Sequence, residues 1–392
     1  MELTNKQAIG LKIAVERYKN AEKYTVISGY AGAGKSTLVK FIVKALNVDE
    51  DEVCYACFTG KAAQVLLKKG NKNVSTLHKL LFESHPLPDG SFIRIPKTSI
   101  PYTIIIVDEC SMAPKELVDL LLSHPCYVIF LGDPFQLPPI NPKDDNHLLD
   151  SPHVFLDEIM RQAQESDIIR LSMDIREGKR LETFDGKDAK IMPVSQLVDG
   201  MYTWADQILC ATNKTRVSIN NELRKMLGHE GPPQKGDKLI VLKNDWDTIA
   251  DNGDPLVNGT IGYLGEGYKS FVRYPYWCNG GGKFDIFKSQ FVSETNADFG
   301  VLAMDYNLIV NGEKSLDWKT EYALSRNYKT KHMIPYELTY GYAITTHKAQ
   351  GSQWDKVLVL EESFPFAREE HARWLYTAVT RAAEKLVLIR KE

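Results

Sequence analysis

The chain has 392 residues, 43% of them hydrophobic and 25% charged, and its formal net charge is −3. This composition is typical of a globular protein with several domains and excludes a disordered or collagen-like chain. The N-terminus has no apolar stretch of the signal-peptide kind, and no apolar run approaches the ~20 residues of a membrane helix. Six cysteines in so long a chain do not make a disulfide framework, so we expect a cytoplasmic protein.

Four apolar runs in the first 150 residues predict strands of one parallel sheet, at 24–28, 53–58, 103–107 and 127–131. Apolar runs without alternation are typical of strands buried on both faces. Helices expected at 38–46 and 61–69 alternate with these strands, which favours an α/β layer with ligands at the carboxyl ends of the strands. Between them, Asp89-Gly90 predicts the tip of a hairpin insertion at 82–101.

The first strand leads directly into Gly29-Tyr-Ala-Gly-Ala-Gly34-Lys35-Ser36-Thr37, which matches the pattern G-x-x-x-x-G-K-[ST]. Glycines let backbone N–H groups surround phosphate oxygens, and the following helix adds partial positive charge at its N-terminus. Lys35 is expected near the β- and γ-phosphates, and the Ser36 hydroxyl on a bound Mg²⁺. The strand-loop-helix context disfavours an ordinary glycine-rich turn, so the sequence predicts binding of a nucleoside triphosphate.

Polar residues follow the predicted strands at 103–107 and 127–131, where a bound triphosphate needs further ligands. Asp108 is expected to hold Mg²⁺ and Glu109 to polarise the attacking water. In Gly132-Asp-Pro-Phe-Gln136-Leu-Pro, the amide of Gln136 can sense the γ-phosphate, although a proline-rich turn is the alternative.

The second half of the chain predicts another parallel unit around a β-rich insertion. Strands are expected at 207–211, 356–360 and 385–389, and helices at 214–228 and 370–381. Between them, 232–334 is rich in glycine, asparagine and aromatic residues. Its short runs at 239–242, 259–263 and 270–274 predict the strands of a small β-barrel.

Two basic clusters and one cysteine pair leave alternatives open. Lys61, Lys68, Lys69, Lys72 and Lys79 form one cluster, and the run from Arg326 to His332 forms the other. Each suits a nucleic-acid groove, but each is also compatible with a solvated face. Cys54 and Cys57 have half of a zinc-site spacing, but they lie in a predicted buried strand, so we expect no metal there.

Ordered motifs along the chain resemble those of superfamily 1 helicases, and the RecD-like branch, superfamily 1B, fits best. They are Leu3-Thr4-x-x-Gln7, the phosphate loop, Phe58-Thr59-Gly-Lys61, Ser75-Thr76-Leu-His78, Asp108-Glu109, Gly132-Asp-x-x-Gln136-Leu-Pro138, Met160-Arg161-Gln162, Cys210-Ala-Thr-Asn213, Val257-Asn-Gly259, Thr345-Thr346-His347-Lys348-Ala-Gln-Gly351 and Tyr376-Thr-Ala-Val-Thr380-Arg381. The adenine motif begins at residue 3, so we expect none of the N-terminal domain of full RecD-type subunits.

The resemblance implies roles for the matching positions. Gln7 would read the adenine edge, Gln136 would couple the γ-phosphate to DNA, and Arg161 and Arg381 would be arginine fingers. The implied ATP ligands are Gln7, Gly29, Ala31, Gly32, Ala33, Gly34, Lys35, Ser36, Thr37 and Gly351. The implied DNA ligands are Phe58, Thr59, Lys61, Thr76, His78, Phe92, Pro138, Asn213, Thr345, Thr346, His347 and Lys348.

Three of these assignments have alternatives. Thr76 and His78 are equally suited to structural hydrogen bonds, and Arg381 to the surface of a helix. Phe92 either stacks on a base at the junction or packs within its hairpin.

The implied fold is α/β, with two RecA-like parallel-sheet P-loop domains, a hairpin insertion and an SH3-like β-barrel insertion. Domain 1A would span 1–151, with 82–101 as the strand-splitting pin, domain 1B. Domain 2A would comprise 152–231 and 335–392, and domain 2B would span 232–334.

The implied function is that of an ATP- and Mg²⁺-dependent DNA helicase moving 5′ to 3′ on single strands. A translocase that displaces bound proteins and a nucleotide-gated loader subunit are the alternatives. Expected partners are single-stranded DNA, single-strand/duplex junctions, and single-strand binding, replication or recombination proteins. We expect a monomer without membrane contact, in the cytoplasm of a bacterium or a phage-infected cell.

Overall fold

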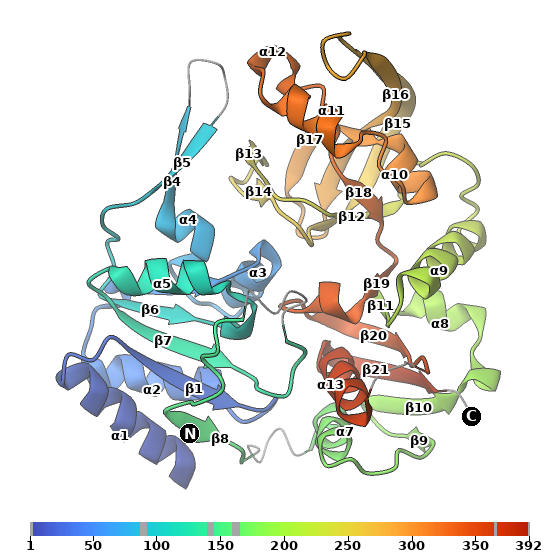
Figure 1. The fold of residues 1–392 in the computed structure, drawn as a ribbon. Helices are drawn as coiled ribbons and strands as arrows, with labels where there is room; N and C mark the ends of the chain where they lie inside the picture. Colours follow the sequence, from blue (N-terminus) through green and yellow to red (C-terminus); the bar gives the residue numbers. More distant parts are fainter. Residues whose placement is uncertain (1–2, 87–91, 139–144, 159–164, 364–366, 391–392) are drawn as a thin grey trace. The chain divides into compact units, whose positions relative to one another are not determined.

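The computed structural model describes residues 3–86, 92–138, 145–158, 165–363 and 367–390. These residues form two compact units (Figure 1). The first comprises Met1–Phe82, Pro96–Thr212 and Ile344–Glu392, and the second comprises Glu83–Ile95 and Asn213–Ala343. Among the described residues, no helix is long and apolar enough to cross a membrane.

The first unit contains a six-stranded parallel sheet in the order β3-β2-β6-β7-β1-β8. Its strands are β1 (Tyr24–Gly29), β2 (Val53–Cys57), β3 (Val74–Thr76), β6 (Ile104–Val107), β7 (Tyr127–Gly132) and β8 (Val154–Leu156). The helices beside it are α1 (Asn5–Lys19), α2 (Lys35–Leu46), α3 (Gly60–Lys68), α4 (Leu77–Leu81) and α5 (Lys115–Ser123). The four strands predicted here are all present, which confirms the parallel α/β layer.

Both faces of this sheet are buried, as the apolar strands predict. In β6, Ile104 and Ile106 pack with α1 and α2, whereas Ile105 and Val107 pack with α4 and α5. Figure 1 shows these helices on opposite faces of the sheet. Successive strand residues point to opposite faces, so a run without polar residues fills two cores.

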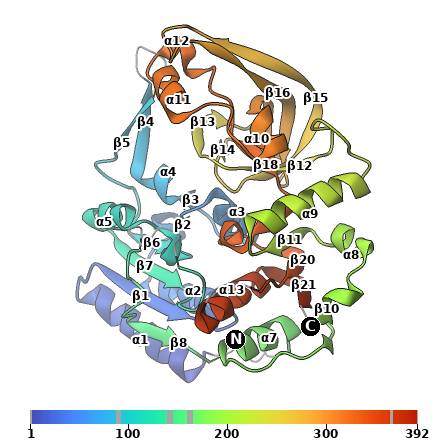
Figure 2. The ribbon, with the colours of Figure 1, turned by 45° about the vertical axis from the view of Figure 1, so that its right-hand side comes forward.

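A second six-stranded sheet has the order β19-β11-β20-β21-β10-β9. Its strands are β9 (Phe184–Asp185), β10 (Ala189–Pro193), β11 (Gln207–Cys210), β19 (Ala343–Thr345), β20 (Trp354–Leu360) and β21 (Ala382–Arg390). The β11, β20, β21 and β10 ladders are parallel, and β9 pairs antiparallel to β10. Figure 2 shows α13 (Arg368–Val379) along β20 and β21. The other neighbouring helices are α7 (Asp167–Arg176) and α8 (Asp199–Trp204).

The second unit is built on an antiparallel sheet in the order β17-β16-β15-β12-β18. The strands are β12 (Lys238–Val241), β15 (Ile261–Tyr274), β16 (Gly282–Ser293), β17 (Asp298–Asp305) and β18 (Leu338–Tyr340). A parallel bridge between Met304 and Tyr336 joins β17 to the segment before β18. The described ladders do not close, so the predicted closed barrel is not confirmed.

Further elements of the second unit are two short strand pairs and four helices. They are β4 (Phe82–Pro86) with β5 (Phe92–Pro96), β13 (Asp245–Ile249) with β14 (Pro255–Leu256), α9 (Asn213–Met226), α10 (Tyr306–Asn311), α11 (Trp318–Ser325) and α12 (Tyr328–Lys331). The β4–β5 pair lies where the hairpin insertion was predicted, and its tip, 87–91, is outside the described residues. A buried ion pair between Arg224 and Asp237 joins α9 to the start of β12.

Candidate functional site

The phosphate loop joins β1 to α2, and its shape requires glycine at three positions. Gly32 and Gly34 have φ of 77° and 76°, in the left-handed region. At Gly29, a Cβ atom would lie 2.7 Å from the carbonyl oxygen of Leu156. The Lys35 ammonium donates to the carbonyl oxygen of Gly29 at 2.7 Å. The other predicted loop ligands lie in the same loop or in the first turn of α2: Ala31, Ala33, Ser36 and Thr37.

Ser36 and Asp108, the predicted magnesium ligands, line one cavity of about 230 Å³. Asp108 follows β6, where burial raises the pKa of its carboxyl; Glu109 raises it further, while the positive charge of Lys69 opposes the shift. A hydroxyl and a carboxylate are oxygen ligands of the kind that Mg²⁺ takes, and a divalent cation would favour the ionised carboxylate. The residues present therefore fit a magnesium site.

Glu109 contacts both Gln136 and Arg381. With its amide nitrogen turned toward Glu109, Gln136 donates to Oε2 of that carboxylate at 3.2 Å and accepts from Arg381 at 3.2 Å. Arg381 also lies 3.9 Å from Oε1 of Glu109. Glu109 has φ of 51°, a conformation rare outside glycine and enriched at functional sites. The structure thus brings together three of the predicted catalytic side chains.

Arg381 is held in place by backbone oxygens. It lies two residues beyond the end of α13 and is 5% exposed, so a position on the helix surface is excluded. Its guanidinium donates to the carbonyl oxygens of Thr377 at 3.1 Å and Ser352 at 3.2 Å. These hydrogen bonds fix the charge on the side of the second sheet.

Tyr376, on α13 beside the second sheet, bonds to the side of the first sheet, and no role was predicted for it. Its hydroxyl accepts from the backbone N–H of Ala31 at 2.8 Å and donates to Asp133 at 2.6 Å. Burial raises the pKa of the Asp133 carboxyl, although Lys35 and Tyr376 oppose the shift. The position of Tyr376 in the same motif as Arg381 is the only signal that the sequence offered.

The loop after β7 is held by three more residues, two on α13 and one between β19 and β20. Thr377 accepts from the Leu137 N–H at 2.9 Å, Gln350 donates to the Leu137 carbonyl at 2.7 Å, and Arg373 donates to the Pro134 carbonyl at 2.9 Å. This loop carries Gln136. These hydrogen bonds therefore tie the residues on both sides of Gln136 to the elements beside the second sheet.

Gln7 lies beside the phosphate loop and is 1% exposed. Its amide oxygen accepts from the Thr4 N–H at 3.0 Å, and its nitrogen donates to the Ala33 carbonyl at 3.3 Å. The first bond completes the capping box of α1. The structure thus gives Gln7 a role in joining α1 to the loop, and adenine recognition stays a prediction.

Several predicted DNA ligands of the first unit lie together. The His78 ring lies 5.7 Å from that of Phe58 and 6.2 Å from that of Phe82, between centroids. The Lys61 ammonium lies 5.3 Å from the centre of the Trp354 ring. A Cβ on Gly351 would lie 3.1 Å from the hydroxyl oxygen of Thr59, so the predicted ATP ligand Gly351 contacts a predicted DNA ligand.

Other predicted DNA ligands have structural roles. Thr76 caps α4 by accepting from the Lys79 N–H at 3.3 Å, which is the hydrogen bond named as its alternative. Thr346 is fully buried and donates to the Cys210 carbonyl at 3.4 Å. Thr345 is buried too, Lys348 is half-buried, and burial lowers the pKa of His347. Direct DNA contact by these side chains stays a prediction.

Three predicted residues are not placed in this arrangement. Arg161 and the side chain of Phe92 are outside the described residues. Asn213 is exposed at the start of α9, in the second unit. Pro138, in contrast, is exposed in the first unit, two residues beyond Gln136.

Two lysines of the first basic cluster have different surroundings: Lys72 pairs with Glu50 at 3.0 Å, whereas Lys69 lines the cavity of Asp108. Cys54 and Cys57 are buried in β2, where burial raises the pKa of both thiols, that of Cys54 to about 12.

Two families match the chain. Residues 3–190 match the AAA domain family, and residues 340–389 match the UvrD-like helicase C-terminal domain family. The first match contains the phosphate loop, Glu109 and Gln136, and the second contains Gly351, Tyr376 and Arg381. The two matches therefore cover the two sides of the Glu109–Arg381 contact.

The chain is similar to two helicases of known name. It is 26% identical to the ATP-dependent RecD2 DNA helicase of Deinococcus radiodurans, over 93% of this chain and 46% of that protein. It is 26% identical to the ATP-dependent DNA helicase dda of Enterobacteria phage T4, over 65% of this chain and 64% of that protein. The chain thus spans about half to two thirds of the length of these relatives.

A solved structure shares the fold. The Pif1 helicase from Bacteroides, in complex with ADP-AlF3 and single-stranded DNA, matches with a TM-score of 0.52 and 18% identity, over 99% of this chain and 92% of that one. Both family matches and the helicase relatives agree with the resemblance of the ordered motifs to the RecD-like branch of superfamily 1 helicases, superfamily 1B.

Proposed function

We propose that this chain is an ATP-dependent DNA helicase that moves 5′ to 3′ along single-stranded DNA and unwinds duplex. The observation that carries the proposal is the contact of Glu109 with Gln136 and Arg381. It joins a carboxylate after β6, an amide after β7 and an arginine after α13. Such a site hydrolyses ATP only when both sheets are in place, which links hydrolysis to their relative motion.

Each residue has a distinct part in hydrolysis. The phosphate loop and Lys35 hold the triphosphate, and Glu109 accepts a proton from the water that attacks the γ-phosphorus. As the bond to the β–γ bridging oxygen breaks, Arg381 stabilises the negative charge of the transferring phosphoryl group. Ser36 and Asp108 would hold Mg²⁺, which neutralises phosphate charge when bound.

Coupling to DNA follows from the hydrogen bonds on the loop after β7. Gln136 touches Glu109 and Arg381, and its neighbour Leu137 is bonded to Thr377 and Gln350. The Gly351–Thr59 contact brings one motif of the expected DNA set beside the second sheet. Closing and opening of the sheets around ATP would therefore alter the grip on the strand.

The roles of the insertions belong to this proposal. We assign 1–151 to domain 1A, 152–231 with 335–392 to domain 2A, and 82–101 to the strand-separating pin. Residues 232–334 would form an SH3-like domain 2B over the DNA, and the Met304–Tyr336 bridge supports a barrel-like curvature. Action on junctions, association with replication or recombination proteins, and a monomeric state in the cytoplasm remain predictions.

ATP turnover with and without single-stranded DNA tests the proposal. We expect DNA to stimulate turnover, and Lys35→Ala to lower it by at least ~100-fold, because the variant loses the charge nearest the phosphates. Lys44→Ala, on the exposed face of the same helix, is the matched control and should retain wild-type turnover. Lack of DNA stimulation, or substantial turnover by Lys35→Ala, would contradict the proposal.

A further inference from the structure

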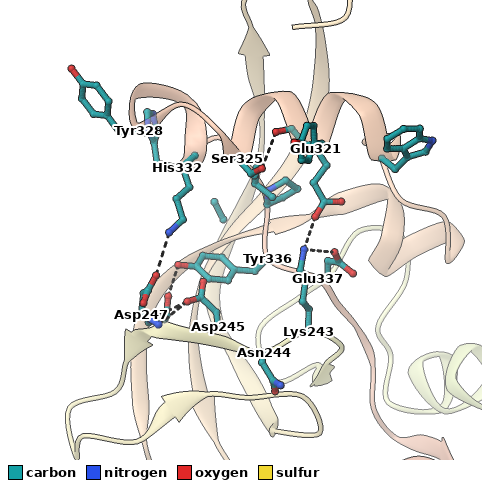
Figure 3. A pocket seen from close by; sticks show the side chains of 17 residues that line it. Lys243, Asn244, Asp245, Asp247, Glu321, Ser325, Tyr328, His332, Tyr336 and Glu337 are labelled. Atoms are coloured by element: carbon teal, nitrogen blue, oxygen red, sulfur yellow. Dashed lines mark hydrogen bonds and ion pairs between the residues drawn. The ribbon is translucent and has the colours of Figure 1, made fainter. Parts of the chain in front are cut away.

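A wide groove lies in the second unit, outside the site described above. It has a volume of about 830 Å³ and lies between the α11–α12 pair and the segment that contains β13. Figure 3 shows its lining, with Asp245, Asp247 and Tyr336 on one side and Glu321, Ser325 and His332 on the other. All of its lining residues belong to the second unit, so the groove is complete within one compact part of the chain.

Ion pairs hold part of the floor of the groove. Lys243 pairs with Glu321 at 2.5 Å and lies 3.6 Å from Glu337, and Lys331 pairs with Asp247 at 3.3 Å. Tyr336 bonds to the hydroxyl of Thr248 at 2.7 Å. The lining has two lysines and four carboxylates, and the carboxylate of Asp245 accepts from the backbone N–H groups of Asp247 and Thr248, so the floor itself does not attract an anion.

The rim has a different character because three large aromatic side chains are exposed there. Trp318 is 73%, Tyr322 56% and Tyr328 52% exposed. Trp318 and Tyr322 are four residues apart and share one face of α11. Figure 3 shows Tyr328 pointing away from the floor. Folding alone gives no reason for such exposure, which is typical of an interaction surface.

Each of these rings has a cation beside it. The distances from the cationic group to the ring centre are 5.7 Å for Lys319 and Trp318, 5.6 Å for Arg326 and Tyr322, and 5.7 Å for Lys329 and Tyr328. We call these six residues the aromatic rim. Across the part of the chain that the structure describes, none of its three cations forms an ion pair.

The charge of the α11–α12 segment, unlike that of the floor, favours an anionic ligand. Residues 318–332 contain four lysines and arginines but a single carboxylate, Glu321, which is already paired with Lys243. Alternating rings and cations offer stacking surfaces for bases and charges for phosphates. An apolar protein partner would gain little from three solvated cations, whereas a polyanion with flat bases is complementary to both components.

We propose that the aromatic rim binds single-stranded DNA, with bases stacked on Trp318, Tyr322 and Tyr328 and phosphates on Lys319, Arg326 and Lys329. The inference rests on the proposed helicase function and adds a contact outside both parallel sheets. Because stacking is possible for every base, the rim holds a strand with little sequence preference. It would lengthen the bound segment without entering the ATP site.

Fluorescence anisotropy with labelled oligothymidine tests the rim directly. The strand should have about 30 nucleotides, above the roughly 4–16 that one binding module covers. For the triple variant Trp318→Ala/Tyr322→Ala/Tyr328→Ala of the full chain, we expect an affinity loss of at least ~10-fold, since each stacked base contributes about 5- to 100-fold. Turnover without DNA should not change.

Two variants separate stacking from general surface effects. Trp318→Phe/Tyr322→Phe/Tyr328→Phe keeps three stacking rings and should bind within about twofold of wild type. Tyr276→Ala/Trp277→Ala is the matched control, because these residues of the same unit are 84% and 56% exposed and lie outside the groove. It should bind like wild type.

Charge substitution gives an independent readout. Lys319→Gln/Arg326→Gln/Lys329→Gln should reduce the slope of log affinity against log salt by about 2, from roughly 0.7 per single-strand phosphate contact. If thermal melting shows that the alanine variant is unfolded, the salt dependence of the charge variant still tests the proposal. An unchanged slope would then overturn the proposal.

The outcomes distinguish this inference from the proposed function. If DNA stimulates turnover but the folded alanine variant binds it like wild type, the rim is not a DNA site and a protein partner becomes the better account. Equal losses of DNA affinity in the alanine variant and in the Tyr276/Trp277 control would also overturn the proposal. If the wild-type chain neither binds DNA nor responds to it, the proposed function itself fails.

Discussion

Tyr376→Phe removes a single hydroxyl that joins the phosphate loop, Asp133 and the helix leading to Arg381. The ring remains, so its edge-to-face packing on Phe135, at 5.2 Å between centroids, is preserved. The variant loses the 2.8 Å bond from the Ala31 N–H and the 2.6 Å bond to the Asp133 carboxylate. It therefore isolates the hydrogen bonds between the two sheets.

The size of the effect follows from burial. Tyr376 is 1% and Asp133 3% exposed, so little water can replace the lost hydroxyl. The Ala31 N–H loses its acceptor, and Asp133 keeps the Phe135 N–H but loses its second donor; a buried polar group left without a partner costs ~1–3 kcal/mol. If about 1.5–3 kcal/mol of this stabilises the arrangement in which Arg381 meets Glu109, the competent population falls roughly 10- to 100-fold, as 1.4 kcal/mol corresponds to a factor of ten.

The assay is steady-state ATP turnover at saturating single-stranded DNA, with kcat and KM for ATP determined separately. We expect kcat to fall ~10- to 100-fold with a smaller change in KM, because the ligands of the phosphate loop remain. Tyr127→Phe is the matched control: its buried hydroxyl bonds to Thr25 at 2.5 Å and to the Ala14 carbonyl at 3.0 Å, away from the site. Equal kcat losses in the two variants, or a Tyr376→Phe kcat within twofold of wild type, would refute the reasoning.

Two further substitutions test other parts of the structure. Arg381→Lys keeps the positive charge but loses the planar guanidinium that reaches Ser352, Thr377 and Gln136. In the turnover assay, kcat should therefore fall ~10³-fold with ATP affinity retained. A tenfold or smaller loss of kcat would argue against an arginine finger. Asp237→Asn breaks the buried pair with Arg224 and should lower the free energy of unfolding by ~3–5 kcal/mol, which denaturant titration measures. Burial opposes ionisation of Asp237, yet hydrogen bonds from Arg224 and His229 outweigh it and lower the pKa of its carboxyl. The resulting stabilisation is complete above the unfolded pKa near 4 and is lost as pH falls through the folded pKa. Asp237→Asn should therefore flatten the dependence of the free energy of unfolding on acid pH, and an unchanged dependence would contradict the assignment.

The parallel sheets were predictable because their sequence signal is local. In β6 and β7 every residue is apolar, and burial on both faces requires that pattern. The segments 259–263 and 270–274 were predicted as two strands but belong to one, β15. Gly265 and Gly267 lie between the two segments, and a Cβ at Gly267 would lie 2.6 Å from the Phe287 ring. Glycine is needed there because an aromatic ring of the neighbouring strand occupies the space.

The site was predictable motif by motif, but its connections were not. The positions of Lys35, Asp108 and Glu109 follow from the strands that precede them. Tyr376 bonds to residues 345 and 243 positions away, and no local pattern specifies such a pairing. Likewise, the run from Arg326 to His332 suggested a nucleic-acid groove, but only the fold places Trp318 and Tyr322 beside it. Tertiary contacts of this kind depend on how whole elements pack.

Strand displacement from tailed duplexes tests the central claim most directly. With ATP, the chain should release the labelled strand from a duplex with a 5′ single-stranded tail and leave the 3′-tailed duplex intact, and Lys35→Ala should release neither. Efficient unwinding of the 3′-tailed duplex alone would contradict the direction. Absence of unwinding from either tail, in a preparation whose turnover is stimulated by single-stranded DNA, would contradict the assignment as a helicase.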